Sequence, residues 1–222
     1  EGSKTVNLGN AATLADNSVL TGNGIFTPFD QKFDKVGYTI GADWQFAPRA
    51  GVFARYTSAF RLPSVGSFIT SATAVPRTQG IDLWEAGLKY QSRLASVYLT
   101  GFLTDFNSYG IGNTRFDPVT NGYVSQTVYT DTRAYGVEFE GTVRPTSWFD
   151  FTLNATWQDP TFRNLRYDEL TTVNGQQTLV PRDYSGNQLI RVPKIALRAT
   201  PAVTLLGDRL RAQVDVEHYT KR

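Results

Sequence analysis

Two glutamates, Glu138 and Glu140, have the residue type and spacing that best suit chemistry in this 222-residue sequence. Positions two apart on a strand share one face and lie about 7 Å from each other. Paired carboxylates at that distance could act in acid–base hydrolysis or hold a cation. The alternative is a solvated wall, in which both pair with basic neighbours such as Lys89, Arg144 or Arg198. We favour the wall interpretation and predict no catalytic residue.

Other chemically capable side chains are few. The single histidine, His218, cannot build a histidine-rich metal site and fits better at a strand end. The chain has no cysteine, and therefore no thiol nucleophile or thiolate metal site. The glycine-rich stretches at 22–27 and 110–113 lack the strand-to-helix context of a phosphate-binding loop. The sequence therefore predicts a protein that is not an enzyme and holds no metal or cofactor.

The elements that must position the glutamates are strands. Apolar and polar residues alternate around them with a period of two, which is typical of a strand with two unlike faces. The same alternation recurs at 36–47, 51–60, 82–90, 94–106, 132–144, 149–159, 191–203 and 210–219. No segment has a convincing helical period. We expect an all-β, antiparallel fold of about eight strands.

The connections between these segments alternate in length. Short ones lie at 47–50, 91–93, 145–147 and 205–208. Long ones follow Arg61, Ser108 and Pro160, and residues 1–35 look like one more long connection. Outer-membrane barrels combine tight periplasmic turns with long outer loops in this way. The pattern indicates a sheet with two unlike ends.

The overall amino-acid composition excludes several classes of protein. Hydrophobic residues make up 41% of the chain, yet no run of about 18 apolar residues exists, which excludes a membrane-spanning helix. The net charge of +2 is too small to indicate a nucleic-acid binder. Aromatic residues gather near strand ends, as in the girdles of membrane barrels. They are Trp44, Phe46, Tyr90, Trp148 and Phe149 beside the short turns, and Trp84, Tyr135 and Trp157 toward the long connections.

The strands of a soluble β-sandwich also alternate apolar and polar residues, so this is the main competing fold. The uniformly polar second face, the strand lengths, the aromatic ends and the asymmetric connections all favour a membrane barrel instead. We therefore expect part of an antiparallel transmembrane β-barrel whose apolar face contacts the lipid of a bacterial outer membrane.

Four segments carry a family resemblance. The stretch 36–64 ends in an aromatic-Arg-x-Pro step, and 83–108 contains E-x-G-x-K-Y followed by F-x-T-D-F. The stretch 131–145 contains Y-G-V-E-x-E-G, and 189–201 contains the V-P of a later strand. In this order and spacing, residues 36–219 resemble TonB-dependent outer-membrane receptors.

The resemblance implies a barrel of about 22 strands with an N-terminal plug. Residues 1–222 would be an internal piece of it, with 1–35 an extracellular loop and 36–219 strands and loops. The plug, the TonB box and the final strand would belong to the rest of the parent protein. Glu138 and Glu140 would face the lumen or the plug.

The implied function is uptake of a ferric siderophore or similar iron complex, with energy delivered through the TonB complex. Its partners would be outer-membrane lipid, TonB through the missing N-terminal region, and a small ligand, but no nucleic acid. Aromatic and arginine side chains in the loops suit ligand contact. The candidates are Phe60, Arg61, Arg77, Tyr109, Arg115, Phe116 and Tyr123.

Other functions remain open at this point. One is a passive porin, or a TonB-dependent channel for oligosaccharides or cobalamin. Another is a surface binding or adhesion β-protein, whose long loops would form the active surface.

Overall fold

The computed structural model describes residues 3–7, 26–30, 32–63, 77–117, 122–173, 175–207 and 209–220. Every regular element in these ranges is a β-strand. The strands are β1 (Ser3–Asn7), β2 (Phe26–Asp30), β3 (Tyr38–Ala47), β4 (Ala50–Arg61), β5 (Gln79–Gln91), β6 (Ala95–Asp117), β7 (Gly122–Val143), β8 (Phe149–Phe162), β9 (Arg166–Val173), β10 (Gln176–Asp183), β11 (Ile195–Leu205), β12 (Leu210–Gln213) and β13 (Val216–Tyr219). No helix in the described ranges is long and apolar enough to cross a membrane.

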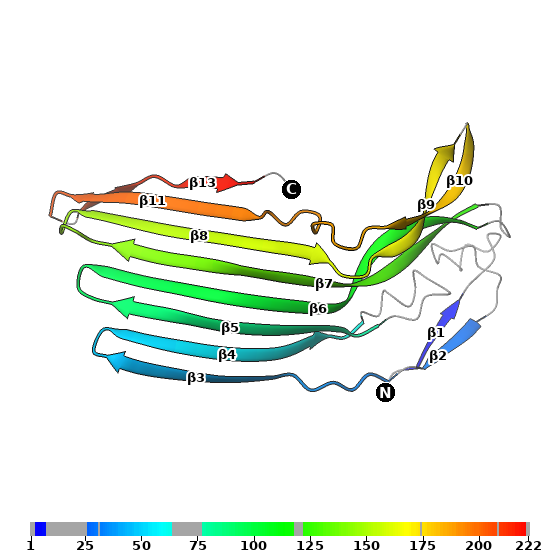
Figure 1. The fold of residues 1–222 in the computed structure, drawn as a ribbon, viewed down its shortest axis with the longest axis horizontal. Helices are drawn as coiled ribbons and strands as arrows, with labels where there is room; N and C mark the ends of the chain where they lie inside the picture. The colour runs from blue at the N-terminus through cyan, green and yellow to red at the C-terminus, as the bar shows by residue number, and fades with distance from the viewer. Residues whose placement is uncertain are drawn as a thin grey trace.

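The main sheet is antiparallel and open, with the order β12-β11-β8-β7-β6-β5-β4-β3 and with β13 also paired to β11 (Figure 1). Seven of the eight predicted segments each overlap one strand of this sheet, and the eighth, 210–219, covers β12 and β13, so the all-β antiparallel prediction is confirmed. β1 and β2, within the expected loop 1–35, pair with each other in a separate two-stranded sheet.

The last predicted strand is broken, which the alternation did not show. β12 pairs with residues 202–205 of β11, and β13 pairs with residues 196–199. Opposite the gap between β12 and β13 stands Pro201, whose oxygen accepts from the Val214 N–H. Proline has no N–H to return to the neighbouring strand, so the ladder is interrupted at this point.

The two ends of the sheet differ as expected, but two of the long connections contain strand hairpins. β6 and β7 have 23 and 22 residues and stay paired far past the rest of the sheet (Figure 1). The expected loop after Ser108 is therefore largely a hairpin, because strand pairing satisfies the backbone N–H and C=O groups. The connection after Pro160 likewise contains a hairpin, formed by β9 and β10.

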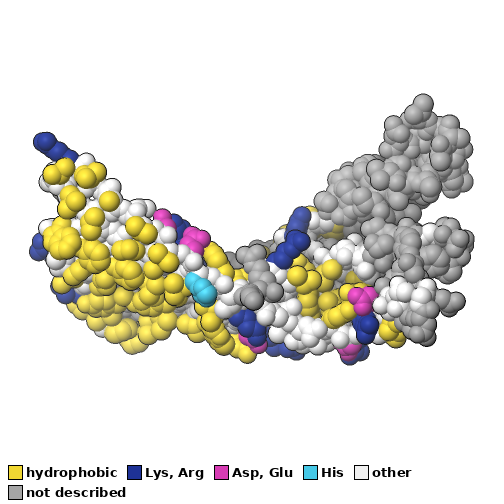
Figure 2. Space-filling model, turned by 90° about the horizontal axis from the view of Figure 1, so that it is seen from above, with side chains coloured by type: hydrophobic (Ala, Val, Ile, Leu, Met, Phe, Trp, Pro, Cys, Tyr) yellow, Lys and Arg dark blue, Asp and Glu magenta, His cyan; other side chains and the backbone are white. Residues whose placement is uncertain are grey.

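One face of the sheet is apolar and uncovered. Leu88 and Leu99 are directly opposite each other on β5 and β6, with 51% and 39% of their surface exposed. Figure 2, seen from above the sheet of Figure 1, shows hydrophobic side chains gathered over the half of the molecule that carries the short turns. Water would disfavour so large an apolar surface, whereas lipid matches it.

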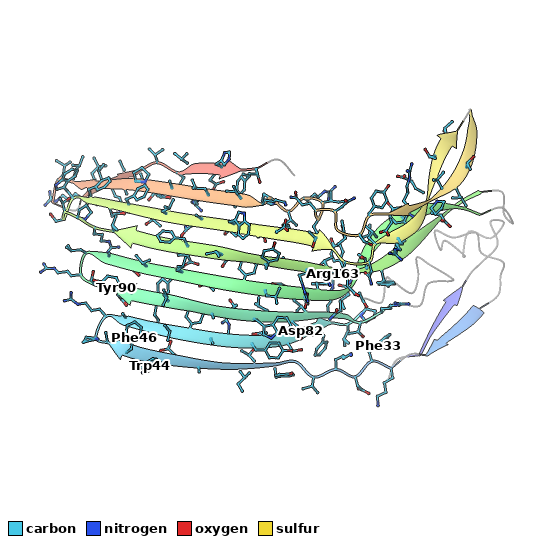
Figure 3. All side chains as sticks on the ribbon, viewed as in Figure 1. Phe33, Trp44, Phe46, Asp82, Tyr90 and Arg163 are labelled. Atoms are coloured by element: carbon cyan, nitrogen blue, oxygen red, sulfur yellow. The ribbon has the colours of Figure 1, made fainter. Side chains whose placement is uncertain are left out.

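Aromatic side chains border this face at both ends. Trp44, Phe46 and Tyr90 lie toward the short turns (Figure 3). At the other end the Tyr56 and Trp84 rings are 5.2 Å apart, and the Tyr135 and Trp157 rings are 6.0 Å apart. These two belts are made of the aromatic residues just named, and all of them except Tyr56 were predicted to lie at these ends of the strands.

Buried side chains gather beyond the second belt, where the hairpins leave the sheet. Phe162 and Leu165 are each 4% exposed, and Pro160 and Thr130 are fully buried. We call this outer end of the sheet, with residues 106–112, 128–132 and 160–165 and the connection 184–194, the mouth. It holds most of the enclosed core in the described chain, and it positions the candidate site.

Candidate functional site

A bulge in β6 shapes the mouth. Phe106 pairs with Thr132 and Tyr109 pairs with Thr130, so β6 carries one extra residue over this step. The extra residue brings the rings of Phe106 and Tyr109 to the same face of the sheet. They meet edge to face, with centroids 5.5 Å apart and planes at 85°.

The bulge is held by hydrogen bonds to an aspartate on β7. Ser108, which has a positive φ of 58°, donates its N–H to Asp131 Oδ1 at 2.9 Å. Asn164 Nδ2 donates to Asp131 Oδ2 at 3.0 Å, and Asn164 Oδ1 accepts from the Asp131 N–H at 2.6 Å. The carboxylate of Asp131 is thus engaged in fixing the backbone.

A pocket of about 420 Å³ opens beside the two rings. Its walls come from residues 106 and 109–112 of β6, from Thr132 and Phe162, and from the segment 189–192. A volume of this size falls in the range of small-molecule sites, which are mostly apolar with a few polar groups. Arg191 is the one charged residue among the described residues that line it.

The segment 189–192 is fastened to the end of β8. The Leu189 N–H donates to the Pro160 oxygen at 3.0 Å, and the Phe162 N–H donates to the Asn187 oxygen at 2.9 Å. Gln188 Nε2 closes the segment on itself by donating to the Val192 oxygen at 2.8 Å. The far wall of the pocket is therefore set by the fold.

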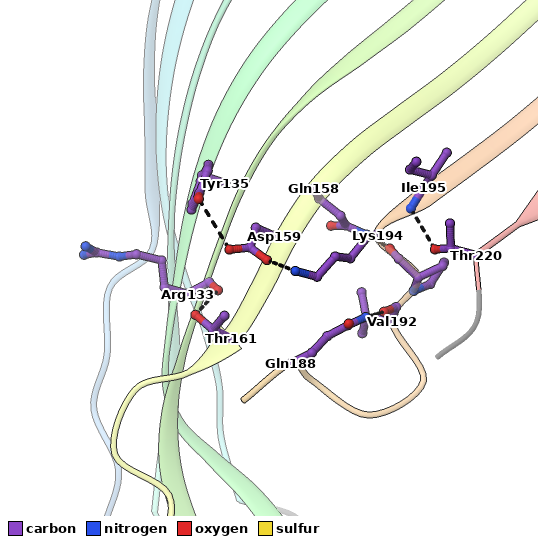
Figure 4. A network of polar contacts seen from close by, with 11 residues as sticks. Arg133, Tyr135, Gln158, Asp159, Thr161, Gln188, Val192, Lys194, Ile195 and Thr220 are labelled. Carbon is purple, nitrogen blue, oxygen red and sulfur yellow. Dashed lines mark hydrogen bonds and ion pairs between the residues drawn. The ribbon is translucent and has the colours of Figure 1, made fainter. Parts of the chain in front are cut away.

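A polar network next to the pocket anchors the start of β11 (Figure 4). Asp159 accepts from the Tyr135 hydroxyl at 3.3 Å and pairs with the ammonium of Lys194. Gln158 Nε2 donates to the Pro193 oxygen at 3.1 Å. These contacts join the second aromatic belt to the segment that forms the pocket wall.

The predicted ligand residues are placed in different surroundings. Tyr109 lines the pocket. Phe116 and Tyr123 are directly opposite each other on the β6–β7 hairpin, and Arg115 is next to them; their side chains lie outside the described residues. Of the predicted residues whose side chains the structure describes, only Tyr109 lines the pocket.

Of the other three candidates, Phe60 and Arg61 lie at the end of β4, and Arg77 lies just before β5. Phe60 is in register with Gly80, on the face that carries Trp84, and Arg61 is in register with Gln79. The Arg77 guanidinium lies 5.4 Å from the centre of the Tyr129 ring. Arg77 thus has a partner in β7, and its contact ties the start of β5 to the hairpin.

Sequence reasoning missed Arg191, Phe106 and Phe162 as pocket residues. Arg191 stands directly before the V-P of a predicted strand and has a positive φ of 67°, which a strand assignment conceals. Phe106 and Phe162 were interpreted as strand residues or as part of a long connection. No local signal in the sequence joins these distant segments.

Glu138 and Glu140 lie on the polar face of the sheet. Glu138 is in register with Thr100 and Thr156, and Glu140 is in register with Tyr98 and Asn154. The two carboxylates form a pair on one face, as their spacing predicts.

The predicted salt bridges from these two glutamates to Lys89, Arg144 or Arg198 are wrong. Lys89 pairs with Asp43, and Arg198 pairs with Asp215 at 3.2 Å and Glu217 at 3.7 Å. Over the described ranges neither Glu138 nor Glu140 makes an ion pair, with Arg144 or any other base. Strand parity assigns a residue to a face, but it does not decide which neighbour on that face a flexible cation reaches.

Two chemical roles fit this arrangement. The described residues contain no cluster of three or more His, Cys, Asp or Glu side chains that could hold a metal ion. The glutamate pair places negative charge on the polar face of the sheet. The pocket at the mouth offers apolar surface and one guanidinium to a small ligand.

An open antiparallel sheet with one apolar face, aromatic belts and a polar opposite face defines the wall of an outer-membrane β-barrel. The family described as "TonB dependent receptor-like, beta-barrel" matches residues 9–219. The chain belongs to this family, which confirms the predicted resemblance and the predicted location in the bacterial outer membrane. A search of curated protein sequences found no match.

Solved structures share the fold. The FrpB iron transporter of Neisseria meningitidis is 14% identical with a TM-score of 0.56, over 87% of this chain and 27% of its own. The alcaligin outer-membrane receptor FauA of Bordetella pertussis is 13% identical with a TM-score of 0.54, over 88% and 31%. The copper transporter OprC is 12% identical with a TM-score of 0.52, over 75% and 24%. The chain thus spans about a quarter to a third of the length of these structures.

Proposed function

We propose that this barrel wall belongs to a receptor that imports a ferric siderophore or a similar iron complex, with energy delivered through TonB. The observation that carries the proposal is the family match over residues 9–219. Among proteins of the same fold, one is named an iron transporter and another an outer-membrane receptor for alcaligin. The copper transporter of the same fold makes a different metal complex the second candidate cargo.

In this mechanism the mouth captures the ligand. The pocket beside Tyr109 lies among the outer hairpins, where a ligand from outside would arrive first. The polar face, with Thr100, Thr156 and the two glutamates, lines a hydrated path through the barrel. The apolar face stays in contact with lipid throughout.

The glutamate pair faces the plug of the parent protein. Glu138 is half-buried, and a half-buried carboxylate without a partner is costly, so a cationic side chain of the docked plug would stabilise it. Glu140 is exposed and would add its negative charge to the attraction. When TonB pulls on the plug these contacts would break, and water would solvate the glutamates. The pair would then belong to the path rather than to the ligand site.

The experiment is uptake of radioactive iron by cells that carry the full-length parent protein, with and without a working TonB. We expect uptake of iron complexes that stops when TonB is removed. Uptake that persists without TonB would indicate a passive channel. TonB-dependent uptake of copper but not of iron would indicate that the cargo is a copper complex. Adhesion to surfaces without uptake of any solute would overturn the transport proposal.

A further inference from the structure

We propose that the short-turn end of the sheet binds an anionic phospholipid of the periplasmic leaflet through the phosphate of its headgroup. The site is a groove of about 670 Å³ between the turns that follow β3, β5 and β7, and we call it the turn groove. Short turns of outer-membrane barrels lie on the periplasmic side. The proposal concerns how the barrel contacts its membrane and does not depend on the transported cargo.

Each of the four short turns carries one arginine. They are Arg49, Arg93, Arg144 and Arg209. The first three turns, at 48–49, 92–94 and 144–148, contain no acidic residue. These turns lie side by side at one end of the sheet (Figure 1), and Figure 2 shows basic side chains at this end. Because neighbouring strands are about 5 Å apart, successive turns are about 10 Å apart and their arginines follow one row.

Three of these arginines line the turn groove. They are Arg49, Arg93 and Arg144, and no carboxylate lines it among the described residues. Hydroxyl-bearing residues complete the polar part of its walls, namely Tyr90, Ser92, Thr146 and Ser147. Guanidinium and hydroxyl groups donate hydrogen bonds to phosphate oxygens, and arginine can do so through two parallel bonds. The lining therefore favours a phosphate over a cation.

The charges of the three arginines are largely available to a ligand. None of them makes an ion pair over the described part of the chain. Asp150 is near enough to Arg144 for their charges to interact, but both of its oxygens accept hydrogen bonds from Arg211, at 2.8 and 2.9 Å. At the outer end, by contrast, Arg133 is paired with Asp105. The chain itself therefore offsets only part of the positive charge at the turn groove.

Hydrogen bonds between neighbouring turns hold the arginines in place. The Gln91 N–H donates to the Arg49 oxygen at 2.9 Å, which joins the first turn to the second. The Arg144 N–H donates to the Leu94 oxygen at 2.7 Å, which joins the second turn to the third. The backbone of the turn groove is thus fixed before a ligand arrives, and binding loses less conformational entropy.

Apolar side chains beside the arginines favour a lipid over a soluble anion. Leu94 and Tyr90, which line the turn groove, are 59% and 42% exposed. Trp148, which directly follows Ser147, is 54% exposed. Aromatic side chains of this kind lie at the level of lipid headgroups. A phospholipid would place its phosphate on the arginines and its acyl chains on these apolar side chains, whereas a free phosphate would leave the latter uncovered.

The test uses the full-length parent protein in a neutral detergent, with native mass spectrometry to measure the dissociation constant of bound lipid. One probe is dioleoylphosphatidylglycerol, which is anionic. The other is dioleoylphosphatidylcholine, which has the same acyl chains but no net charge. The variants are Arg93→Gln, Arg144→Gln, their combination, and the double variant with lysine at both positions. Arg209→Gln is the matched control, because Arg209 is in a short turn but is not among the described residues that line the turn groove.

We expect the wild type to bind phosphatidylglycerol about 10-fold or more tightly than phosphatidylcholine, because several basic residues attract the anionic headgroup. Arg93→Gln and Arg144→Gln should each weaken binding of phosphatidylglycerol by about 5-fold, and the double variant by about 20-fold. Binding of phosphatidylcholine should change little. The double lysine variant should retain most of the affinity, because lysine keeps the charge. Arg209→Gln should leave the tightest bound phosphatidylglycerol unchanged.

Equal affinity of the wild type for the two lipids, or full affinity in the double glutamine variant, would overturn the inference. Weakening by Arg209→Gln as large as that by Arg93→Gln would overturn it too, since the surface charge as a whole would then bind lipid without a built site. Competition with two soluble anions, glycerol phosphate and polyglutamate, tests the source of the phosphate. We expect neither to displace phosphatidylglycerol, and displacement by either would assign the turn groove to a soluble anion instead of a lipid.

Discussion

The wall between the aromatic belts and the mouth beyond them are built from the same strands but stabilised differently. In the wall, large apolar side chains such as Leu88 and Trp84 remain exposed. In the mouth, Phe162, Leu165 and Thr130 are buried by the chain itself. The apolar side chains of the wall therefore depend on lipid for burial, whereas the mouth carries its own small core. Alternation of apolar and polar residues is thus enough for these strands to form the wall, whereas the mouth also depends on side chains that pack against one another.

The regularity of strand pairing also differs between the wall and the mouth. From the partners Ala95 and Val143 to the partners Phe106 and Thr132, β6 and β7 stay in register without a break. The bulge begins only at the mouth, directly after Phe106. A regular ladder suits a wall that must leave no unpaired backbone group in lipid, and an irregular one can aim side chains at a ligand.

The largest expected effect comes from removing the core of the mouth. Phe162→Ala should cost about 3–5 kcal/mol of local stability, because the neighbours cannot fill the cavity left by a buried ring. Hydrogen exchange of the backbone around residues 160–165 and 184–189, in the full-length protein in detergent, measures it. Phe149→Ala in the wall is the control and should leave exchange at the mouth unchanged. Similar exchange at the mouth in both variants would contradict a separate core.

The second test compares the two faces of the wall by placing the same charge at two adjacent positions of β6. Leu99→Arg puts a charge on the apolar face and should cost about 2–4 kcal/mol near the middle of the bilayer. Thr100→Arg puts the same charge on the polar face, within reach of Glu138, and should cost little. The fraction of protein folded in vesicles against urea concentration measures both. Equal costs would mean that the Leu99 face does not contact lipid.

Much of the wall could be predicted from the sequence. A period of two fixes which residues share a face, so the two faces and both belts follow from residues such as Trp44, Leu88 and Trp157 without long-range information. The break opposite Pro201 could also have been suspected, since proline cannot complete a ladder.

The mouth could not be predicted in the same way. One extra residue near Ser108 turns Tyr109 to another face, and nothing in the local pattern marks it. The pocket also joins β6 to Phe162 and to residues 189–192, which are far apart in the chain. The partners of Glu138 and Glu140 escaped prediction as well, because parity specifies a face and not a contact.

The third test asks whether the polar wall or the mouth limits transport. Glu138→Leu combined with Glu140→Leu should lower TonB-dependent iron uptake by about 10-fold, roughly the loss of one charge-assisted contact of 1.4 kcal/mol. Assembly in the membrane should stay intact, also after reversal of both charges to lysine. Glu169→Leu, on the β9–β10 hairpin, is the control and should leave uptake unchanged. Full uptake in the double variant would show that both glutamates only keep the polar face of the wall hydrated.

The smallest expected effect concerns the bulge that separates wall from mouth. Asp131→Ala removes the acceptor of the Ser108 N–H and one partner of Asn164, and should cost about 1 kcal/mol locally. Asp131→Asn keeps an oxygen for the Ser108 N–H and should cost less. Hydrogen exchange at residues 106–110 measures both, with residues 97–101 of the same strand as the internal reference. Faster exchange confined to the bulge would show that Asp131 holds Tyr109 in place, whereas equal acceleration along the strand would show that the bulge and the wall open as one unit.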